Sequence, residues 1–160
     1  MKINANNYTE VTEILKEISS LASKKINEIY SDDFKEFRKK DNSPVTVADI
    51  ESNRIIIDKL SKNFRNIKLI SEESKERSLQ GEEEFFIIDP LDGTKEFIKK
   101  NGEFTVNIAL IQKSKAVLGI VELPVSYTQY YSDGNKSYKK VKNSEKIITT
   151  KYLTDYIITI

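Results

Sequence analysis

Residues 87–111, IIDPLDGTKEFIKKNGEFTVNIALI, form the stretch of the sequence that decides the fold. An apolar run at 85–88 predicts a buried β-strand that stops at Asp89-Pro90, where proline fixes a sharp departure of the chain. Apolar residues then alternate over 104–112, which is the pattern of a second strand. Between the two, Gly93-Thr94 is placed to open a helix.

Candidate metal-binding and phosphate-binding residues lie at the end of the first strand. Asp89 and Asp92 are three residues apart, and two carboxylates this close repel each other unless a proton or a cation lies between them. With the Leu91 carbonyl they make an oxygen site suited to Mg²⁺. Free N–H groups at Gly93-Thr94 would favour a phosphate, and Thr94 could orient a water molecule. An ordinary Asp-Gly turn without a ligand is the alternative interpretation.

Two amphipathic helices precede this stretch. Residues 7–30 carry apolar side chains at steps of three and four, and Asn7 with Glu10 has the form of a capping box. A second helix is predicted to begin after Thr46, with Asp49 three positions on, and to end near Asn63. The predicted apolar stripes are Val11, Ile14, Leu15, Ile18, Leu21, Ala22, Ile26 and Ile29 in the first helix, and Ile50, Ile57, Leu60 and Phe64 in the second.

Short strands make up the rest of the chain. An acidic segment at 72–84 predicts a solvated loop or a short helix. Two helices followed by a run of mostly antiparallel strands indicate the α+β class. Apart from the two strands already described, we predict strands at 67–70, 116–123, 127–132, 137–141 and 156–160.

The composition excludes several classes of binding and catalysis. The 160 residues suit one domain, and 26 Lys+Arg against 25 Asp+Glu lack the basic surplus of a general nucleic-acid binder. With no Cys and no His, thiol nucleophiles, iron–sulfur clusters and the usual zinc sites are excluded. Catalysis would have to use carboxylates, hydroxyls, Lys or Tyr, together with a hard cation such as Mg²⁺.

Neither a signal peptide nor an apolar run of about 18 residues is visible, so we expect no transmembrane segment. The lack of cysteine fits a reducing compartment. We therefore expect a cytoplasmic protein, and leave open a peripheral association with the inner face of the membrane.

Two further segments place carboxylates where a strand or turn gives way to a loop or helix, a usual position for functional sites. Ser71-Glu72-Glu73 ends the strand at 67–70, and DNSPVTVAD (41–49) leads into the second helix. Taken alone, Glu72 and Glu73 are typical of a solvated acidic pair, and Asp49 is typical of a helix cap.

Together, DNSPVTVAD (41–49), LISEES (69–74) and the stretch 87–111 resemble the bacterial 3′(2′),5′-bisphosphate nucleotidases. These belong to the inositol monophosphatase superfamily of lithium-sensitive, Mg²⁺-dependent phosphatases. The resemblance runs in order from about Lys16 to Val125, and Glu96 before Phe97 resembles the nucleotidase branch. It implies the N-terminal half of an inositol-monophosphatase-like layered α/β sandwich, with two helices packed on a mostly antiparallel sheet.

The resemblance also implies roles for individual residues and a small-molecule substrate, a nucleoside bisphosphate. Adenosine 3′,5′-bisphosphate would be hydrolysed to AMP and phosphate by a metal-activated water. Glu72 and Thr94 would hold that water, Asp49 would line a further metal position, and Gly93 with Thr94 would grip the scissile phosphate. The implied metal ligands are Glu72, Asp89, the Leu91 carbonyl and Asp92, and the implied substrate contacts are Glu72, Leu91, Asp92, Gly93 and Thr94.

Members of that family continue into a Trp-Asp-x-Ala-Ala motif whose Asp is a metal ligand, whereas this sequence has no Trp. We therefore expect 1–160 to be an N-terminal inositol monophosphatase-like domain whose C-terminal domain is absent, weakly active or inactive by itself. The alternatives are a non-catalytic remnant, one piece of a split enzyme, and an inositol monophosphatase-like sugar phosphatase. The substrate is left open among adenosine 3′,5′-bisphosphate, its sulfated precursor and inositol phosphates.

Two other readings of the acidic motif are disfavoured. A haloacid-dehalogenase-type phosphatase also places Asp-Gly-Thr after an apolar strand, but its nucleophilic Asp lies two residues before the second Asp. Position 90 is Pro here. A calcium loop of the EF-hand type needs acidic residues at alternating positions, which Asp89 and Asp92 do not provide.

Overall fold

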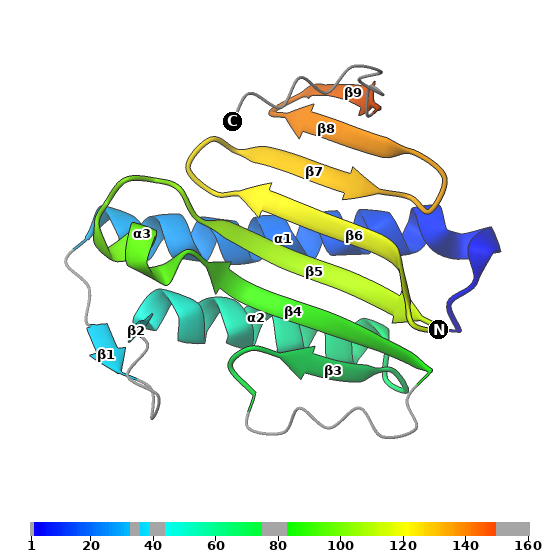
Figure 1. Ribbon diagram of the computed structural model, residues 1–160, viewed down its shortest axis with the longest axis horizontal. Coiled ribbons are helices and arrows are strands. Elements are labelled where there is room, and N and C mark those ends of the chain that lie inside the picture. Colours follow the sequence, from blue (N-terminus) through cyan, green and yellow to red (C-terminus); the bar gives the residue numbers. More distant parts are fainter. Residues whose placement is uncertain (1, 33–35, 39–43, 75–82, 150–160) are drawn as a thin grey trace, which may run out of the picture.

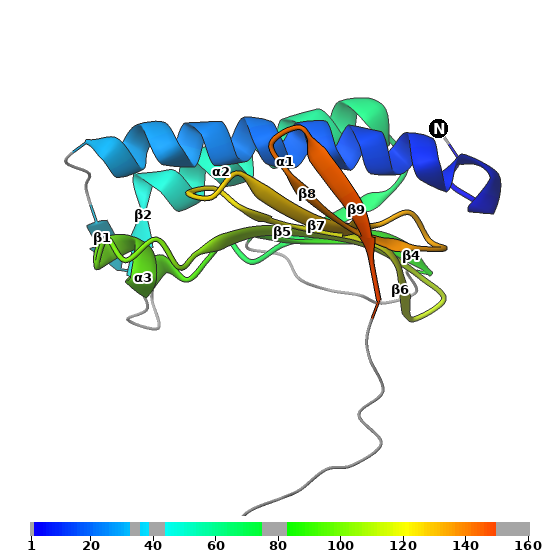
Figure 2. The same cartoon turned by 90° about the horizontal axis from the view of Figure 1, so that it is seen from above.

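The computed structural model describes residues 2–32, 36–38, 44–74 and 83–149. In this part of the chain, two long helices lie side by side on one face of a seven-stranded sheet (Figure 1). Seen from above, the helices form one layer and the sheet forms the other (Figure 2). The α+β class and the packing of two helices on a mostly antiparallel sheet are confirmed.

The helices and strands of the described residues have the following bounds. The helices are η1 (Ala5–Asn7), α1 (Tyr8–Ser31), α2 (Val47–Asn63) and the short α3 (Thr94–Ile98). A small separate sheet pairs β1 (Glu36–Arg38) with β2 (Pro44–Thr46). The main sheet consists of β3 (Lys68–Ser71), β4 (Glu84–Asp92), β5 (Thr105–Gln112), β6 (Lys115–Leu123), β7 (Thr128–Ser132), β8 (Ser137–Val141) and β9 (Ser144–Ile148).

The spatial order of the strands in the main sheet is their order in the chain. β3 and β4 are parallel, and every other neighbouring pair is antiparallel. Most of the predicted strands are confirmed to within one or two residues, whereas β9 was not predicted. The strand predicted at 156–160, and the acidic residues 75–82, lie outside the described residues.

The first helix begins differently from the prediction. Asn7 makes no side-chain cap hydrogen bond to α1, so the capping box predicted with Glu10 is wrong. Instead, Asn4 and Asn7 cap the preceding turn η1, and the Asn4 side chain accepts from the backbone N–H of Asn6 at 3.0 Å. Leu21, predicted on the buried stripe, is 36% exposed. Polar Ser19 and Ser23 are buried on the sheet side in its place.

The second helix begins as predicted. Thr46 and Asp49 form a capping box, which satisfies N–H groups at the start of α2 that have no partner within the helix. The helix ends at Asn63, as predicted. Its buried stripe is shifted from the predicted one: Ile50 lies in solvent, and Ile56 rather than Ile57 is fully buried.

One apolar core lies between the helices and the facing side of the sheet. Phe64, which caps the C-terminal end of α2, and Phe86 of β4 pack with ring centroids 5.2 Å apart. Burying rings of this size removes a large apolar area from water, which is the main force that holds the two layers together. The largest fully buried side chains are Phe64, Phe86, Phe97, Phe104, Leu15, Ile18, Ile26, Ile56, Leu60, Ile88, Leu91 and Ile108.

Strand β4 departs from the prediction in two respects. It does not stop at Asp89-Pro90 but continues to Asp92 through an irregularity in its pairing with β5. It is also buried on one side only, because Ile87 is 48% exposed while Phe86 and Ile88 are buried. Successive side chains of a strand point to opposite faces, and the helices cover one face of this sheet.

Within the described residues, no helix is long and apolar enough to cross a membrane.

Candidate functional site

The irregularity in β4 brings two carboxylates to the same face of the sheet. Asp89 pairs with Asn107 of β5 and Asp92 pairs with Thr105, so three steps along β4 match two steps along β5. In a regular strand, residues three apart point to opposite faces, and the one extra residue of a bulge reverses this. Asp89 and Asp92 therefore both lie on the face turned away from α1 and α2.

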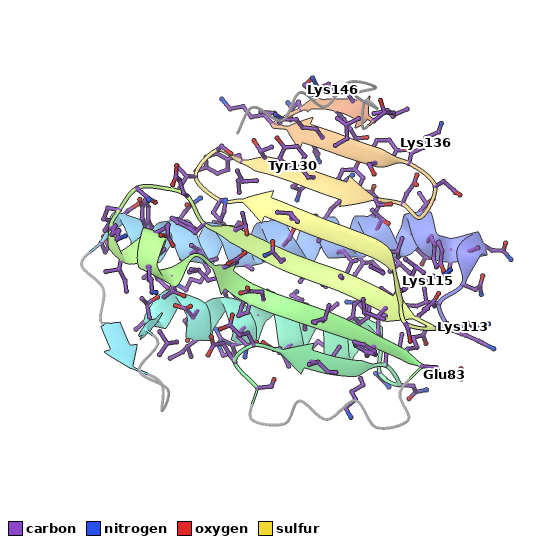
Figure 3. All side chains as sticks on the ribbon, in the orientation of Figure 1. Glu83, Lys113, Lys115, Tyr130, Lys136 and Lys146 are labelled. Atoms are coloured by element: carbon purple, nitrogen blue, oxygen red, sulfur yellow. The ribbon has the colours of Figure 1, made fainter. Side chains whose placement is uncertain are left out.

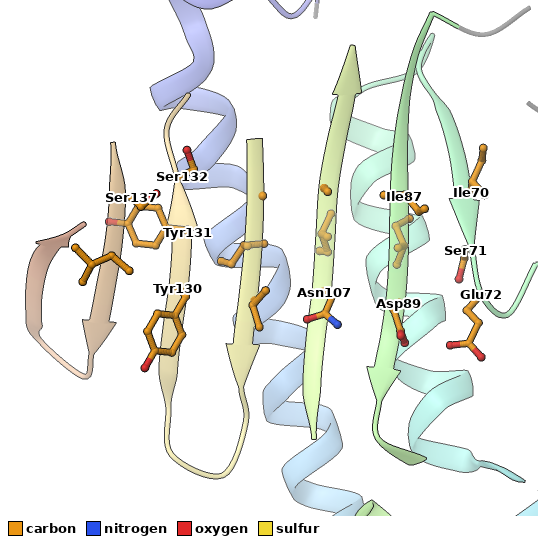
Figure 4. Close-up of a pocket in the computed structure, with 17 residues that line it drawn as sticks. Ile70, Ser71, Glu72, Ile87, Asp89, Asn107, Tyr130, Tyr131, Ser132 and Ser137 are labelled. Carbon is orange, nitrogen blue, oxygen red and sulfur yellow. The ribbon is translucent and has the colours of Figure 1, made fainter. Parts of the chain in front are cut away.

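Glu72 reaches this place from the neighbouring strand. The backbone N–H of Glu72 donates to the Ile88 carbonyl at 2.9 Å, which continues the parallel β3–β4 ladder by one residue and sets Glu72 beside Asp89. Figure 4 shows Glu72 just after β3, beside Asp89 of the adjacent strand β4. The residue before Glu72 is anchored to α2, because the Ser71 hydroxyl donates to the Asn53 side-chain carbonyl at 2.7 Å.

The titration of Asp89 responds to its surroundings. Burial, followed by the negative charges of Glu72 and Asp92, raises the pKa of Asp89 to about 7. A hydrogen bond with the Glu72 carboxyl acts in the same direction, and one from the Leu91 backbone N–H opposes it. Burial and the neighbouring negative charges together keep a proton on Asp89 near neutral pH, and a cation would relieve the repulsion between these carboxylates.

Asn107 is a site residue that the sequence analysis missed. It lies on β5 opposite Asp89, and its side-chain amide donates to the Asp92 carboxylate at 3.3 Å. The Thr105 hydroxyl donates in turn to the Asn107 carbonyl oxygen at 3.0 Å, which orients the amide. An asparagine within an otherwise apolar alternation, one strand away from an acidic motif, is the signal that could have identified it.

Thr94 and Asp49 form a second unit behind the carboxylates. The Thr94 hydroxyl donates to the Asp49 carboxylate at 2.9 Å. The other carboxylate oxygen of Asp49 accepts from both the backbone N–H and the hydroxyl of Thr46, each at 2.7 Å. Asp49 is 1% exposed. The helix cap thus fixes a buried carboxylate that orients the Thr94 hydroxyl. The role of Asp49 in lining a further metal position stays a prediction.

The loop between β4 and α3 is held by its backbone. The Ser52 hydroxyl donates to the Pro90 carbonyl at 2.7 Å, and Thr94 Oγ1 lies 3.4 Å from the Leu91 carbonyl. Leu91 as a whole is 2% exposed, and its side chain belongs to the apolar core.

Gly93 is required at the start of α3. Its φ of +95° is a left-handed conformation that favours glycine, and a Cβ atom there would lie 2.9 Å from the Glu103 carbonyl oxygen. The fold therefore makes the tight turn from Asp92 into Thr94 depend on a residue without a side chain.

The donor set suits a hard cation only in part. Among the described residues, no three Asp, Glu, His or Cys side chains stand in a ready-made metal-binding group. The site instead offers the adjacent Glu72 and Asp89, with Asp92 close enough to raise the pKa of Asp89, and all the donors are oxygens. The residues therefore fit Mg²⁺ with some of its ligands supplied from elsewhere, as water or by other groups.

An apolar hollow of about 670 Å³ adjoins the carboxylates (Figure 4). Glu72, Asp89 and Asn107 lie at one end of it, and Val121 and Tyr130 lie farther along the sheet. The site thus combines a polar end with an open apolar floor.

Comparisons with known proteins place the chain among phosphatases of one family. The model of the inositol monophosphatase family matches residues 7–154. The 3′(2′),5′-bisphosphate nucleotidase CysQ of Salmonella typhimurium is 48% identical over 105 residues, which cover 64% of this chain and 43% of that protein. The crystal structure of CysQ from Bacteroides thetaiotaomicron, described as a bacterial member of the inositol monophosphatase family, is 40% identical with a TM-score of 0.67.

A more distant structure supports the fold alone. An IMPase/NADP phosphatase complexed with Mg²⁺ and phosphate superposes with a TM-score of 0.75 at 17% identity. It is covered to 51% by this chain, and the Bacteroides CysQ is covered to 49%. The chain thus spans less than half the length of the Salmonella relative and about half of these two solved chains.

Proposed function

Because the chain belongs to the inositol monophosphatase family, we propose that it forms the N-terminal half of a Mg²⁺-dependent 3′(2′),5′-bisphosphate nucleotidase. The substrate would be adenosine 3′,5′-bisphosphate, hydrolysed to AMP and phosphate. The observation that carries this proposal is the meeting of Glu72, Asp89 and Asp92 at one edge of the sheet, close to the Thr94–Asp49 pair. The names of the CysQ relatives support the substrate class.

Glu72, Asp89, Asp92 and the Leu91 carbonyl would hold the metal. When bound there, Mg²⁺ would lower the pKa of a water molecule and neutralise charge on the phosphate. Hard oxygen ligands of this kind are the ones that Mg²⁺ prefers. Asn107 would keep the Asp92 carboxylate in place through their hydrogen bond.

The protein groups around the metal would orient the water and the substrate. Because Asp49 accepts the Thr94 hydroxyl hydrogen, the lone pairs of Thr94 Oγ1 are directed away from Asp49 and can accept a hydrogen from a water molecule. Glu72 would accept the second hydrogen of that water. Asp49 acts through Thr94 and is therefore a positioning residue in this proposal. Backbone groups of Gly93 and Thr94 would contact the scissile phosphate.

The chain would need a C-terminal half for full activity, because it spans less than half the length of the Salmonella relative. By itself it would be weakly active or inactive. A cytoplasmic location remains part of this proposal. The second candidate function is a non-catalytic remnant, which the lack of a ready-made three-ligand group among the described residues favours.

A fusion protein tests the proposal. The chain is joined to the segment of Bacteroides thetaiotaomicron CysQ that follows the aligned region, and phosphate release from adenosine 3′,5′-bisphosphate is measured with and without Mg²⁺. We expect Mg²⁺-dependent release by the fusion and near-background release by the chain alone. Asp92→Asn should lower the rate of the fusion at least about a hundredfold, since a well-placed electrostatic group typically contributes ~10²–10³.

Asp58→Asn is the matched control, because Asp58 is exposed on α2 and pairs only with surface cations. Release that continues unchanged in Asp92→Asn, or that needs no Mg²⁺, would contradict the proposal. If the fusion releases no phosphate even with Mg²⁺, the result would favour the non-catalytic remnant.

A further inference from the structure

Three residues near the start of α2, Asp49, Ser52 and Asn53, connect this helix to the candidate site. Their spacing of three and four positions places them on one side of the helix, within about 6 Å along its axis. The side chain of each makes a hydrogen bond of 2.7–2.9 Å to a residue at least 18 positions away in the chain. One short stretch of α2 is thereby joined to three separate segments of the site.

Asn53 holds the end of β3, from which Glu72 projects. The Ser71 hydroxyl donates to the Asn53 side-chain carbonyl at 2.7 Å, and Ser71 is buried. Successive residues of an extended chain point to opposite faces, so the bond that draws Ser71 toward α2 turns Glu72 toward the other face of the sheet. On that face, which is turned away from α1 and α2 and is called the open face here, Glu72 lines the apolar hollow beside Asp89 (Figure 4). Asn53 therefore acts on Glu72 through its neighbour in the chain.

Ser52 holds β4 at the irregularity that brings Asp89 and Asp92 to the same face. The Ser52 hydroxyl donates to the Pro90 carbonyl at 2.7 Å, and Ser52 is fully buried. Pro90 follows Asp89 directly and has no N–H group with which to pair with β5. Because a bulge leaves its extra residue outside the regular ladder, a hydrogen bond from another element is needed to fix its position. Ser52 provides that hydrogen bond.

The strands by themselves fix these carboxylates only in part. Glu72 lies one residue beyond the end of β3, and Asp89 borders the irregular part of β4. Two lysines of the open face, Lys139 and Lys146, pair with each other on β8 and β9, the fourth and fifth strands from β4 (Figure 3). With strands about 4.8 Å apart, they lie roughly 19 Å or more from β4, too far for an ion pair. The hydrogen bonds from α2 supply the constraint that the strands lack.

We propose that Ser52 and Asn53 are positioning residues of the candidate metal site. They hold the ends of β3 and β4 against one turn of α2, and so set the distance between the carboxylates of Glu72 and Asp89. The proposal rests on the proposed function, in which these carboxylates bind Mg²⁺. Groups that hydrogen-bond directly to metal ligands typically contribute ~10–100-fold to metal affinity, and Ser52 and Asn53 act one residue farther away, so each should contribute about three- to tenfold.

Magnesium titration of the whole chain by calorimetry tests this role with matched variants on the same helix. Asn53→Ala and Ser52→Ala remove the bonds to the strands, whereas Asn63→Ala and Ser61→Ala remove bonds that reach only the preceding turn of α2. We expect Asn53→Ala and Ser52→Ala each to raise the Kd for Mg²⁺ about three- to tenfold, and both controls to leave it unchanged. A Kd that is the same in Asn53→Ala, Ser52→Ala and the unmutated chain would overturn the proposal.

A double-mutant cycle separates positioning from a general loss of stability. Ser71→Ala removes the donor of the bond to Asn53, so its effect on Mg²⁺ affinity and that of Asn53→Ala should not add. The double variant should bind Mg²⁺ as weakly as the weaker of the two single variants, and no more weakly. Effects that add would show that Asn53 does not act through Ser71, and the proposal would be wrong.

Amide hydrogen exchange followed by NMR gives a readout that needs no metal. The Glu72 N–H donates to the Ile88 carbonyl at 2.9 Å, so release of the end of β3 should expose it to solvent. Asn53→Ala should speed exchange at Glu72 but not in the centre of β5, and Asn63→Ala should change neither. Exchange that rises equally at both places would reflect a loss of global stability and overturn the positioning role.

The two proposals can fail separately. If the unmutated fusion releases no phosphate while Asn53→Ala still alters Mg²⁺ affinity and exchange at Glu72, the nucleotidase activity is contradicted and the positioning role stands. If the fusion releases phosphate, and Ser52→Ala and Asn53→Ala do not slow it even at limiting Mg²⁺, the activity stands and the positioning role is wrong.

Discussion

The two faces of the sheet are built from alternate residues of the same strands, yet they differ in almost every physical respect. In β4, Phe86 and Ile88 are buried under α2, while Ile87 between them is nearly half exposed. The covered face is mostly apolar, apart from a buried cluster in which Ser19 and Gln129 donate to the Glu122 carboxylate. The open face has an apolar centre, but its ends are the carboxylates at one edge and the lysines at the other. Stability is concentrated on one face, and groups able to bind other molecules are concentrated on the other.

The same division explains why the acidic edge is tolerated. A carboxylate packed against a closed core loses its hydration and needs hydrogen-bond donors in exchange, as Glu122 has in Ser19 and Gln129. At the edge of the open face, Asp92 stays exposed and Asp89 is only partly buried, so their repulsion is limited by solvent. A fold that covers one face of its sheet can therefore keep a cation site on the other.

The largest expected difference between the faces is in stability. Phe86→Ala removes a fully buried ring that packs on Phe64, and should lower the free energy of unfolding by about 3–5 kcal/mol. Ile87→Ala, one residue away on the open face, should cost less than about 1 kcal/mol in the chain alone. Urea unfolding followed by circular dichroism measures both values. Equal losses would show that the open face is packed against something in the isolated chain.

Next in size is the effect of the Thr94 hydroxyl on catalysis. In the fusion with a C-terminal half, Thr94→Val should lower kcat by about 10²–10³, because the group that orients the water is lost. Thr94→Ser keeps the hydroxyl and should keep most of the rate. Thr94→Val also removes a hydrogen bond to the buried Asp49 carboxylate, so it should lower the unfolding free energy by about 1–3 kcal/mol relative to Thr94→Ser. A Thr94→Val enzyme as fast as Thr94→Ser would remove Thr94 from the proposed mechanism.

A smaller effect concerns the pH dependence of stability in metal-free buffer. The folded chain holds the Asp89 proton up to about pH 7, whereas the ordinary pKa of the carboxyl, near 3.8, applies in the unfolded chain. The folded state therefore binds more protons between these values, and its stability falls as the pH rises from about 4 to 7. Asp89→Asn should flatten this slope, as measured by urea unfolding at several pH values. A slope that is unchanged in Asp89→Asn would assign it to other groups.

Much of the fold could be predicted because the local patterns were strong. The 3.6-residue period of α1, the Thr46–Asp49 cap and the alternation in β5 all correspond to elements of the structure. What failed depended on contacts between distant segments. Leu21 fits the apolar stripe by spacing, but the helix turns Ser19 toward the sheet, where its hydroxyl donates to the buried Glu122 carboxylate at 2.5 Å.

In the candidate site, too, the features that depend on contacts between distant segments could not be predicted. The proximity of Asp89 and Asp92 could be inferred from the chain, but their common face results from a bulge that only the pairing with β5 reveals. Asp49 was recognised as a cap, whereas its bond to Thr94 joins residues 45 positions apart. Asn107 interrupts the apolar alternation, but its role could not be predicted because it comes from its bond to Asp92 on the neighbouring strand. The open apolar face was missed because the strand at 85–88 was expected to be buried on both sides.

Magnesium titration of the chain as it stands tests the central claim most directly, namely that the acidic edge of the open face is a cation site. Saturable but weak binding is expected by calorimetry, and Asp92→Asn should weaken it at least about tenfold, since even outer partners of metal ligands typically contribute ~10–100-fold. Asp58→Asn should bind like the unmutated chain. Equal Mg²⁺ affinity in the unmutated chain and in Asp92→Asn, or no saturable binding by either, would contradict the claim.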